Sequence, residues 1–181
     1  SEKAIKHAKQ MGYDVIMLTG DRQEAADTLA EKIGIDTVLA GVKPHEKAHH
    51  IMRLQDEGRS VAMVGDGIND AAALSAADVG IAMGAGSDIA LDAADFVLLR
   101  NDLIDAVSSL SLGRSTMRRI RGNLGWAFAY NVIGIPLAMG VMLPFTGFLL
   151  PPAFAAAAMS FSSVSVVGNS LLLRWWSPIR E

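Results

Sequence analysis

The chain has 181 residues, no cysteine and a formal net charge of −3 at pH 7. The lack of cysteine excludes disulfides and cysteine-based metal sites within the chain, and so small a charge gives no indication of a nucleic-acid partner. Charged residues are scattered as far as Arg121 and then absent until Arg174. This charge-free stretch of about 50 residues is longer than two membrane-spanning helices require. We therefore expect a soluble part over residues 1–112 and a transmembrane hairpin over residues 113–181.

Helical and strand-like segments alternate through the soluble part. Apolar residues with helical spacing predict helices at residues 2–11, 23–33, 44–57 and 87–93, and one that begins at residue 71. Short apolar segments predict strands at residues 14–18, 37–39, 60–64, 79–83 and 96–99. This alternation predicts an α/β fold in which one mostly parallel sheet is covered by helices on both faces. In the helix at residues 44–57, the inward-facing residues are expected to be Ala48, Ile51, Met52 and Leu54.

The sequence GDGIND at residues 65–70 follows a short apolar strand and precedes a helix. Two carboxylates and an amide therefore lie on a glycine-rich turn at the carboxyl end of a strand, where ligands bind in open α/β sheets. Asp66 and Asp70 repel one another unless a cation neutralises them, and hard oxygen ligands at an open site suit Mg²⁺. The alternative interpretation is a solvated turn in which Asn69 or Asp70 caps the helix.

A second glycine-containing turn, Thr19-Gly20-Asp21, is expected at the same edge of the sheet. Lys47 lies between the two turns in the sequence, in the first turn of the helix that Pro44 opens. A lysine among carboxylates is a compact cation that can neutralise a phosphoryl group. Taken alone, Lys47 indicates only a solvated helix residue, whereas with both turns in this order it indicates a phosphoryl site.

Three motifs occur in a fixed order, namely Thr19-Gly20-Asp21, Pro44-x-x-Lys47 and GDGIND at residues 65–70. Together they resemble the second half of the phosphorylation domain of P-type ATPases, which has the haloacid-dehalogenase fold. The fold class implied is a partial dehalogenase-like parallel sheet with helices on both faces, followed by the α-helical transmembrane hairpin.

This resemblance implies a site for Mg²⁺ and ATP. Asp66 is the magnesium ligand, Asp70 supports the metal beside it, and Lys47 meets the phosphoryl oxygens. The other residues implied in the phosphoryl and nucleotide site are Thr19, Gly20, Asp21 and Asn69.

The nucleophile of the family is the aspartate of an Asp-Lys-Thr-Gly-Thr motif, and no such motif occurs in this sequence. In the family it lies on the first strand of the sheet, upstream of the region matched here, and the nucleotide-binding domain lies between the two. Ala72 stands where family members usually have proline, which is a small departure. The chain begins with Ser rather than Met, so we expect a piece of a longer protein that hydrolyses no ATP by itself.

Positive residues flank the apolar stretch on both sides. As an isolated cluster the arginines before it would indicate phosphate binding, but beside a membrane span they indicate the cytoplasmic side. The two spans are expected at residues 122–143 and 153–173, with a turn at residues 144–152 on the far side. The flanking arginines and the tryptophans expected in an aromatic belt are Arg114, Arg118, Arg119, Arg121, Arg174, Trp126, Trp175 and Trp176.

Polar residues fall near the middle of both predicted spans. Tyr130 and Asn131 lie some 12–14 Å into the first span, where polar groups are costly and often functional. The alternative is that Asn131 hydrogen-bonds a neighbouring helix. In the second span, Met159, Ser162 and Ser163 share one helical face, although methionine and serine are also ordinary packing residues.

A Tyr-Asn pair in one span and Met-x-x-Ser-Ser in the next resemble the seventh and eighth membrane helices of copper(I)-transporting heavy-metal ATPases. The thioether of Met159 suits a soft cation such as Cu(I). Zinc-type members would carry charged residues in these helices, and none occurs here. The Cys-Pro-Cys motif of the family belongs to the preceding helix. The transport site implied by this resemblance consists of Tyr130, Asn131, Met159, Ser162 and Ser163.

The resemblance thus implies part of an ATP-driven copper(I) export pump that cycles through an aspartyl-phosphate. Its partners are the rest of the same pump, with nucleotide-binding and actuator domains and further membrane helices, and the lipid bilayer. The location is a multi-pass plasma or inner membrane with the soluble part in the cytoplasm. The alternatives are a membrane-anchored phosphatase of the dehalogenase fold and a non-catalytic membrane subunit.

Overall fold

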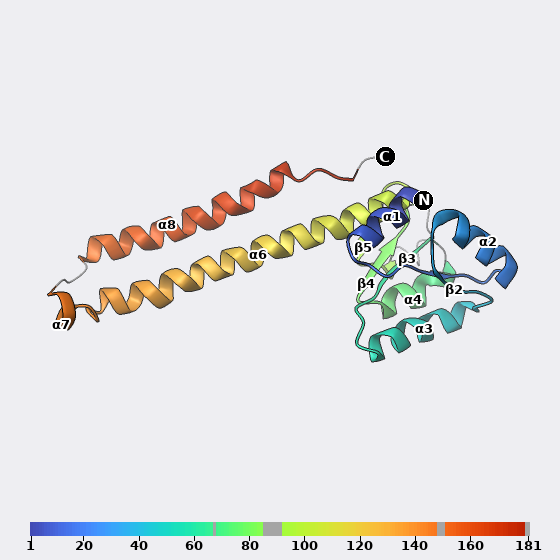
Figure 1. Ribbon diagram of the computed structural model, residues 1–181, viewed down its shortest axis with the longest axis horizontal. Helices are drawn as coiled ribbons and strands as arrows, with labels where there is room; N and C mark the ends of the chain where they lie inside the picture. Colours follow the sequence, from blue (N-terminus) through green and yellow to red (C-terminus); the bar gives the residue numbers. More distant parts are fainter. Residues whose placement is uncertain (67, 85–91, 148–150, 180–181) are drawn as a thin grey trace. The chain divides into compact units, whose positions relative to one another are not determined.

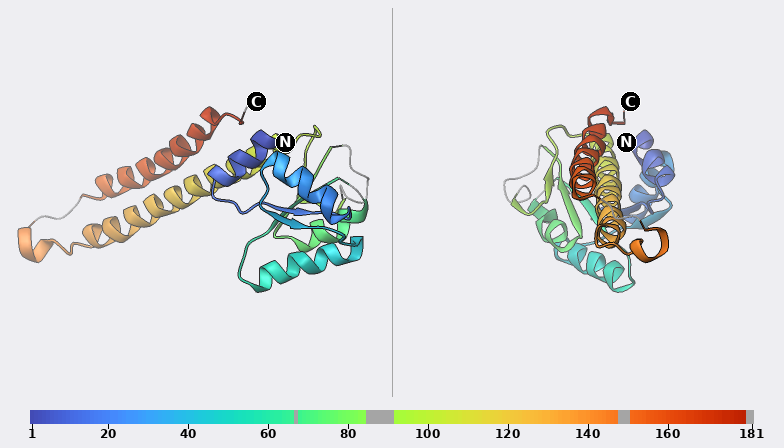
Figure 2. Two further views of the ribbon diagram at one scale, coloured as in Figure 1. Left: turned by 45° about the vertical axis from the view of Figure 1, so that its right-hand side comes forward. Right: turned by 90° about the vertical axis from the view of Figure 1, so that its left-hand side faces the viewer.

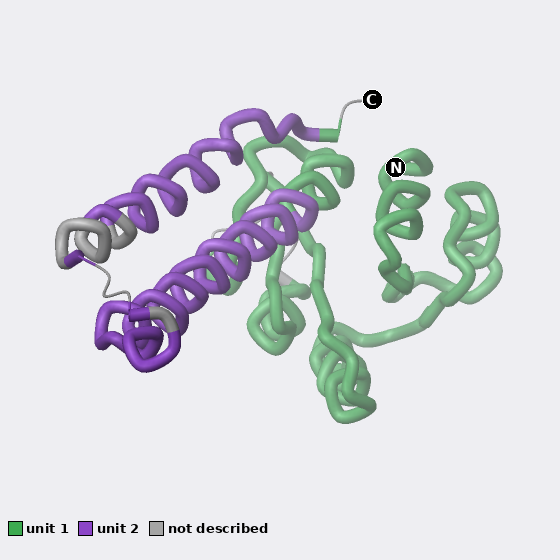
Figure 3. Tube along the Cα trace, turned by 60° about the vertical axis from the view of Figure 1, so that its left-hand side comes forward, with its two compact units in different colours: residues 1–109, 179–181 green, residues 110–178 purple. Residues whose placement is uncertain are grey.

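The computed structural model describes residues 1–66, 68–84, 92–147 and 151–179. The chain divides into two compact units, residues 1–109 with residue 179 onward, and residues 110–178 (Figure 3). Gly67, most of the helix predicted at residues 87–93, and residues 148–150 of the predicted far-side turn lie outside the described residues.

The first unit is an α/β structure with parallel strands, as predicted. Strand β1 (Ile16–Leu18) pairs with β2 (Thr37–Leu39), and β3 (Ala62–Gly65) pairs with β4 (Val79–Ala82), which in turn pairs with β5 (Phe96–Val97). The prediction of one continuous sheet was wrong for the described residues, because these strands form one sheet of two and one of three. Consequently β1 and β3 each keep one edge that pairs with no described strand.

Helices lie on both sides of these strands (Figures 1 and 2). They are α1 (Glu2–Gln10), α2 (Gln23–Ile33), α3 (Pro44–Asp56) and the short α4 (Ala71–Ala76), which follows the 3₁₀ turn η1 (Ile68–Asp70). Helix α2 ends where Gly34 adopts a left-handed conformation with φ of 77°, which glycine adopts without strain. At the start of α3, the Lys43 N–H donates to Glu46 Oε2 at 3.0 Å, and this bond lowers the pKa of the Glu46 carboxyl.

One hydrophobic cluster joins α3 and α4 to the three-stranded sheet. Its buried members are Ile51, Met63, Ala73, Leu74 and Ala82. The predicted inward position of Ile51 is therefore confirmed. The same prediction was wrong for Met52, which is 42 % exposed, because the next residue along a helix is turned by about 100° away from the buried face.

Aspartate side chains bind the backbone where two of the strands begin. Asp78 Oδ2 accepts a hydrogen bond from the Val61 N–H at 2.7 Å, and Asp95 Oδ2 accepts one from the Gly80 N–H at 2.8 Å. The Val61 bond holds the pKa of the Asp78 carboxyl below its usual value, since it stabilises the charged form. These bonds satisfy backbone donors at the beginning of β3 and β4.

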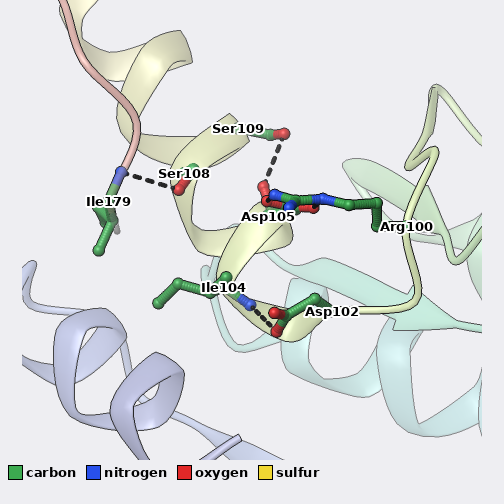
Figure 4. A network of polar contacts seen from close by, with 7 residues as sticks. All are labelled: Arg100, Asp102, Ile104, Asp105, Ser108, Ser109 and Ile179. Atoms are coloured by element: carbon green, nitrogen blue, oxygen red, sulfur yellow. Dashed lines mark hydrogen bonds and ion pairs between the residues drawn. The ribbon is translucent and has the colours of Figure 1, made fainter. Parts of the chain in front are cut away.

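The long helix α6 (Leu103–Ala138) starts within the first unit. Asp102 Oδ1 accepts the Ile104 N–H at 3.0 Å, and Arg100 forms two hydrogen bonds to Asp105, at 2.9 and 2.7 Å (Figure 4). The Asp102 bond satisfies one of the donors that the first turn of a helix leaves without an intrahelical partner.

The end of the chain returns to this part of α6. The Ile179 N–H donates to Ser108 Oγ at 3.2 Å, and the Ile179 side chain packs against a cluster of α1 and α6 residues that includes Ala4, Ile104 and Val107. Residue 179 is therefore part of the first unit although it follows the whole of the second.

The second unit consists mainly of two helices that run side by side, the later part of α6 and α8 (Pro152–Leu171) (Figure 1). A short helix α7 (Leu143–Thr146) lies between them in the sequence, and the 3₁₀ helix η2 (Leu172–Trp175) follows α8. A membrane-crossing helix must be both long and apolar, and none of the helices in the described parts of the chain meets both conditions. The two predicted spans therefore stay a prediction.

Candidate functional site

An ion pair joins the first turn of α3 to the turn after β3. Lys47 Nζ lies 2.6 Å from Asp70 Oδ1, and only 14 % of the Lys47 side chain and 10 % of the Asp70 side chain are exposed. The interpretation of Lys47 as a solvated helix residue is therefore wrong. A short, largely enclosed pair of this kind fixes both charged groups at the carboxyl end of the strand.

The second carboxylate oxygen of Asp70 contacts the same turn, since Asp70 Oδ2 lies 3.4 Å from the Asp66 backbone N, which donates to it. Asp70 occupies the N-cap position of α4 but makes no side-chain capping bond there, and it is 7 % exposed. The alternative of a solvated turn in which Asp70 caps the helix is therefore not supported. Its carboxylate instead accepts a hydrogen bond from the backbone of the turn after β3.

Gly65 makes room for this carboxylate. A Cβ atom at residue 65 would lie 2.7 Å from Asp70 Cβ and 3.0 Å from Asp70 Cγ, which is closer than carbon atoms approach without strain. The last residue of β3 must therefore lack a side chain if Asp70 is to remain where Lys47 meets it.

Asp66 and Asn69, in contrast, are exposed. Asp66 follows the last residue of β3 directly, so its carboxylate is at the strand end and available to a ligand. Mg²⁺ needs only one or two protein carboxylates, with water and phosphate as its other ligands, and Asp66 with Asp70 beside it fits this requirement. Larger clusters, with three or more His, Asp or Glu side chains placed to hold a metal, are absent from the described residues.

The turn after β1 is closed by its own hydrogen bonds. Thr19 Oγ1 donates to Asp21 Oδ2 at 2.9 Å and accepts the Asp21 N–H at 3.1 Å. Backbone bonds from Gly41 to Asp21 and from Val42 to Thr19 tie the turn to the residues after β2, while Gly20 and Asp21 are exposed. The turn is thus preformed, but β1 and β3 belong to separate sheets, so the expected single sheet edge is not formed by described strands.

A cavity of about 640 Å³ opens elsewhere in the first unit, around the residues that lead into β1. Its charged lining residues are already paired, for example Lys9 with Asp36 and Arg59 with Asp14. It includes neither Lys47 nor Asp70, so it is distinct from the candidate phosphoryl site.

The polar residues predicted for a transport site differ in their environment. Tyr130 and Ser162 are half-buried, whereas Asn131 and Ser163 are exposed. Asn131 Nδ2 donates to the Ala127 carbonyl of its own helix at 2.9 Å, and among the described residues no bond from Asn131 to a neighbouring helix is seen. The backbone of Met159 is helical, and its side chain lies outside the described atoms.

Two features of these sites were not predicted from the sequence. Gly65 was treated only as part of a turn, although its position directly before Asp66 at a strand end was a usable signal. Arg119, Asn123 and Asn169 form hydrogen bonds between α6 and α8, and nothing in the local sequence indicates that pairing because about 46 residues separate its partners.

Comparison with protein families defines the class of the first unit. Residues 1–78 match the haloacid dehalogenase-like hydrolase family, which agrees with parallel strands whose carboxyl ends carry the acidic turns. The α/β part of the chain thus has a haloacid dehalogenase-like fold.

The particular relatives are longer proteins that match the second unit as well. The chain is 51 % identical over 178 residues to a probable copper-transporting ATPase, PacS, of Synechococcus elongatus. The aligned residues make up 98 % of this chain and 24 % of that protein. It is 49 % identical over 175 residues to a copper-exporting P-type ATPase of Vibrio cholerae. The aligned residues make up 97 % of this chain and 19 % of that protein. The homologues are therefore copper-transporting P-type ATPases, and the chain spans a quarter or less of their length.

Solved structures agree with this assignment of relatives. A zinc-transporting PIB-type ATPase in the E2P state superposes with a TM-score of 0.81 and 35 % identity, over 95 % of this chain and 27 % of that one. The catalytic domain of a CPx-ATPase, CopB-B, gives a TM-score of 0.56 and 36 % identity, over 59 % of this chain and 43 % of that one.

The position of Gly65 leads to a test of the ion pair. Gly65→Ala forces Asp70 away from Lys47, and we expect the free energy of unfolding to fall by about 1–3 kcal/mol, as in other overpacked sites. Chemical denaturation of the purified chain measures this loss. Gly113→Ala is the matched control, because a Cβ atom there meets no atom within 4 Å. Equal stability of the Gly65→Ala variant and the original chain would contradict this role of Gly65.

Proposed function

We propose that the chain is the C-terminal part of an ATP-driven copper(I) export pump that cycles through an aspartyl-phosphate. The observation that carries the proposal is the identity of about half of all residues to copper-transporting ATPases across both units. Because the chain spans only part of those proteins, the complete activity belongs to the whole pump.

The first unit supplies part of the phosphoryl site. Lys47 neutralises phosphoryl oxygens, and Asp70 holds the Lys47 ammonium in place through their ion pair at 2.6 Å. Asp66, with Asp70 beside it, holds Mg²⁺, which when bound offsets the negative charge that accumulates in phosphoryl transfer. Asn69 supports the same turn. The preformed Thr19-Gly20-Asp21 turn lies over the phosphate and the nucleotide.

The nucleophilic aspartate comes from another part of the pump. This sequence has no Asp-Lys-Thr-Gly-Thr motif, and β1 and β3 each have an edge that no described strand occupies. Open strand edges favour pairing with a further strand, which supports a sheet completed by the rest of the protein. A free-standing phosphatase lacks this source of a nucleophile, and no other observation favours it.

Substitution of the proposed magnesium ligand tests the phosphoryl site. In the full-length pump, Asp66→Asn removes a carboxylate charge without changing side-chain size, so we expect Mg²⁺-dependent phosphoenzyme formation from ATP to be abolished while copper still binds. Radiolabelled phosphoenzyme measures the first property and bound copper the second. Wild-type levels of phosphoenzyme in this variant would exclude Asp66 as the ligand.

The second unit is proposed to lie in the plasma or inner membrane as a hairpin with both ends in the cytoplasm. Its proposed partners are the lipid bilayer and the rest of the pump, including the actuator domain and further membrane helices. The absence of charged residues from residue 122 to residue 173 supports this location. The arginines on both flanks support the orientation, because positive residues favour the cytoplasmic side.

Labelling of introduced cysteines tests this topology. We expect a cysteine at Gly147 of the full-length pump to react with an impermeant thiol reagent added to intact cells, because residue 147 follows α7 at the far turn. A cysteine at Ser177 should react only after the cells are permeabilised. The reverse pattern would show that the hairpin is inverted or absent.

Copper(I) is the proposed cargo. The relatives that are about half identical are copper-transporting, whereas the zinc-transporting structure is 35 % identical. The thioether of Met159 is a soft ligand that suits Cu(I), and the other proposed contributors are Tyr130, Asn131, Ser162 and Ser163. Helices from the rest of the pump complete the site.

Replacement of the soft ligand tests the cargo. Met159→Leu nearly conserves volume, and such substitutions usually cost less than about 1.5 kcal/mol, so the protein should fold. We expect Cu(I)-stimulated ATPase activity and the Cu(I) stoichiometry of the membrane site to fall sharply. Phosphorylation from inorganic phosphate is the control, since it needs no bound Cu(I). Unchanged stoichiometry and unchanged stimulation would mean that Met159 only fills space between helices.

A further inference from the structure

Hydrogen bonds between α6 and α8 gather at one end of the second unit. Arg119 Nη1 donates to the Asn169 carbonyl at 3.0 Å and to Asn169 Oδ1 at 3.2 Å. Asn169 Nδ2 donates to Asn123 Oδ1 at 2.7 Å, and Asn123 Nδ2 donates to Ser170 Oγ at 2.9 Å. We call these four residues, Arg119, Asn123, Asn169 and Ser170, the polar clasp.

The polar clasp belongs to a longer seam along both helices. Half-buried residues recur at intervals of three or four, which is the spacing of one helical face. On α6 these residues include Arg119, Asn123, Ala127, Tyr130 and Gly134. On α8 and the following helix η2 they include Ser162, Val166, Asn169 and Leu173. Residues of the polar clasp and two proposed transport residues, Tyr130 and Ser162, therefore lie on the same facing sides of α6 and α8.

The polar clasp determines which residues of α6 lie opposite which residues of α8. Asn123 bonds directly to Asn169, and the two helices run in opposite directions. Tyr130 is seven residues after Asn123, and Ser162 is seven residues before Asn169. Seven residues are about two helical turns, or roughly 10 Å, and return to nearly the same face. Tyr130 and Ser162 are consequently at the same level of the seam.

We propose that the polar clasp is a positioning device that fixes the register of α6 against α8 and thereby holds Tyr130 level with Ser162 at the transport site. This inference rests on the proposed copper function. The clasp residues do not contact the metal in this proposal, because they lie two turns away from the site. They act through the helices that carry it.

Other contacts along the seam specify the register much less. Apolar surface provides little driving force for helix association within a lipid bilayer, so polar bonds and close packing choose the pairing. A slip of one residue turns a helix by about 100° relative to its partner. Such a slip would move Tyr130 or Ser162 off the seam, and the directional bonds of the two asparagines oppose it.

Substitutions at Asn169 in the full-length pump test the proposal. Asn169→Leu removes both side-chain bonds that Asn169 makes in the clasp. We expect the Cu(I) concentration for half-maximal ATPase stimulation to rise about tenfold, in keeping with the modest energy of each interhelical bond. Asn169→Asp should restore most of the affinity, because its carboxylate still accepts from Arg119 and from the Asn123 amide after a flip. The matched control is Ser165→Ala, since Ser165 bonds only the Phe161 carbonyl of its own helix among the described contacts.

Register is measured separately by cross-linking. These 181 residues contain no cysteine, so in a full-length pump whose other cysteines have been replaced, Ala127→Cys with Val166→Cys creates one defined pair on the seam in lipid bilayers. We expect rapid disulfide formation in the original background and slower formation with Asn169→Leu. Unchanged Cu(I) dependence in the Asn169→Leu pump would overturn the proposal, whether or not cross-linking changes.

Phosphorylation from inorganic phosphate shows that each variant is folded. If Asn169→Leu fails this check, the milder Asn123→Ala replaces it and the same outcomes decide. Failure of the proposed function itself would look different, because the unsubstituted pump would then show no Cu(I) stimulation.

Discussion

The ion pair between Lys47 and Asp70 is the contact on which the candidate phosphoryl site depends. It connects the first turn of α3 to the turn after β3, and both side chains are largely enclosed. A charge in such a position is costly unless it is paired, so the loss of either partner would leave the other unfavourably placed. Gly65 contributes by its lack of a side chain, and Asp66 extends from the turn that the pair holds. A structural ion pair thus positions a neighbouring carboxylate that remains exposed.

Carboxylates also organise the rest of the first unit. Asp78 and Asp95 accept backbone N–H groups where strands begin, and Asp102 accepts one at the start of α6. Each bond is local or spans two adjacent elements, and each satisfies a donor that would otherwise depend on water. The unit therefore uses these three acidic residues at the ends of strands and helices.

The elements that the sequence predicted best have strong local signals. The boundaries of α2 and β2 were predicted correctly because their apolar patterns are regular and Gly34 stops the helix. Lys47 and Asp70 were placed in one site by their order and by a family resemblance. The separation of β1 from β3 was not predictable, since a strand pattern does not specify its partner. The same holds for the pairing of Asn123 with Asn169, which depends on side chains that meet only after the chain has turned back.

The bond between Ser108 and Ile179 has a consequence for the chain as a polymer. Its partners are 71 residues apart in sequence, so the second unit is a closed loop and not a free tail. The entropy of closing a flexible loop rises only slowly with length, by about 0.6 kcal/mol for each doubling. Residues added at the turn near α7 would therefore weaken this closure very little. By the same relation, the length of the hairpin can vary at its far end while its two near ends stay attached to one small cluster around α1 and α6.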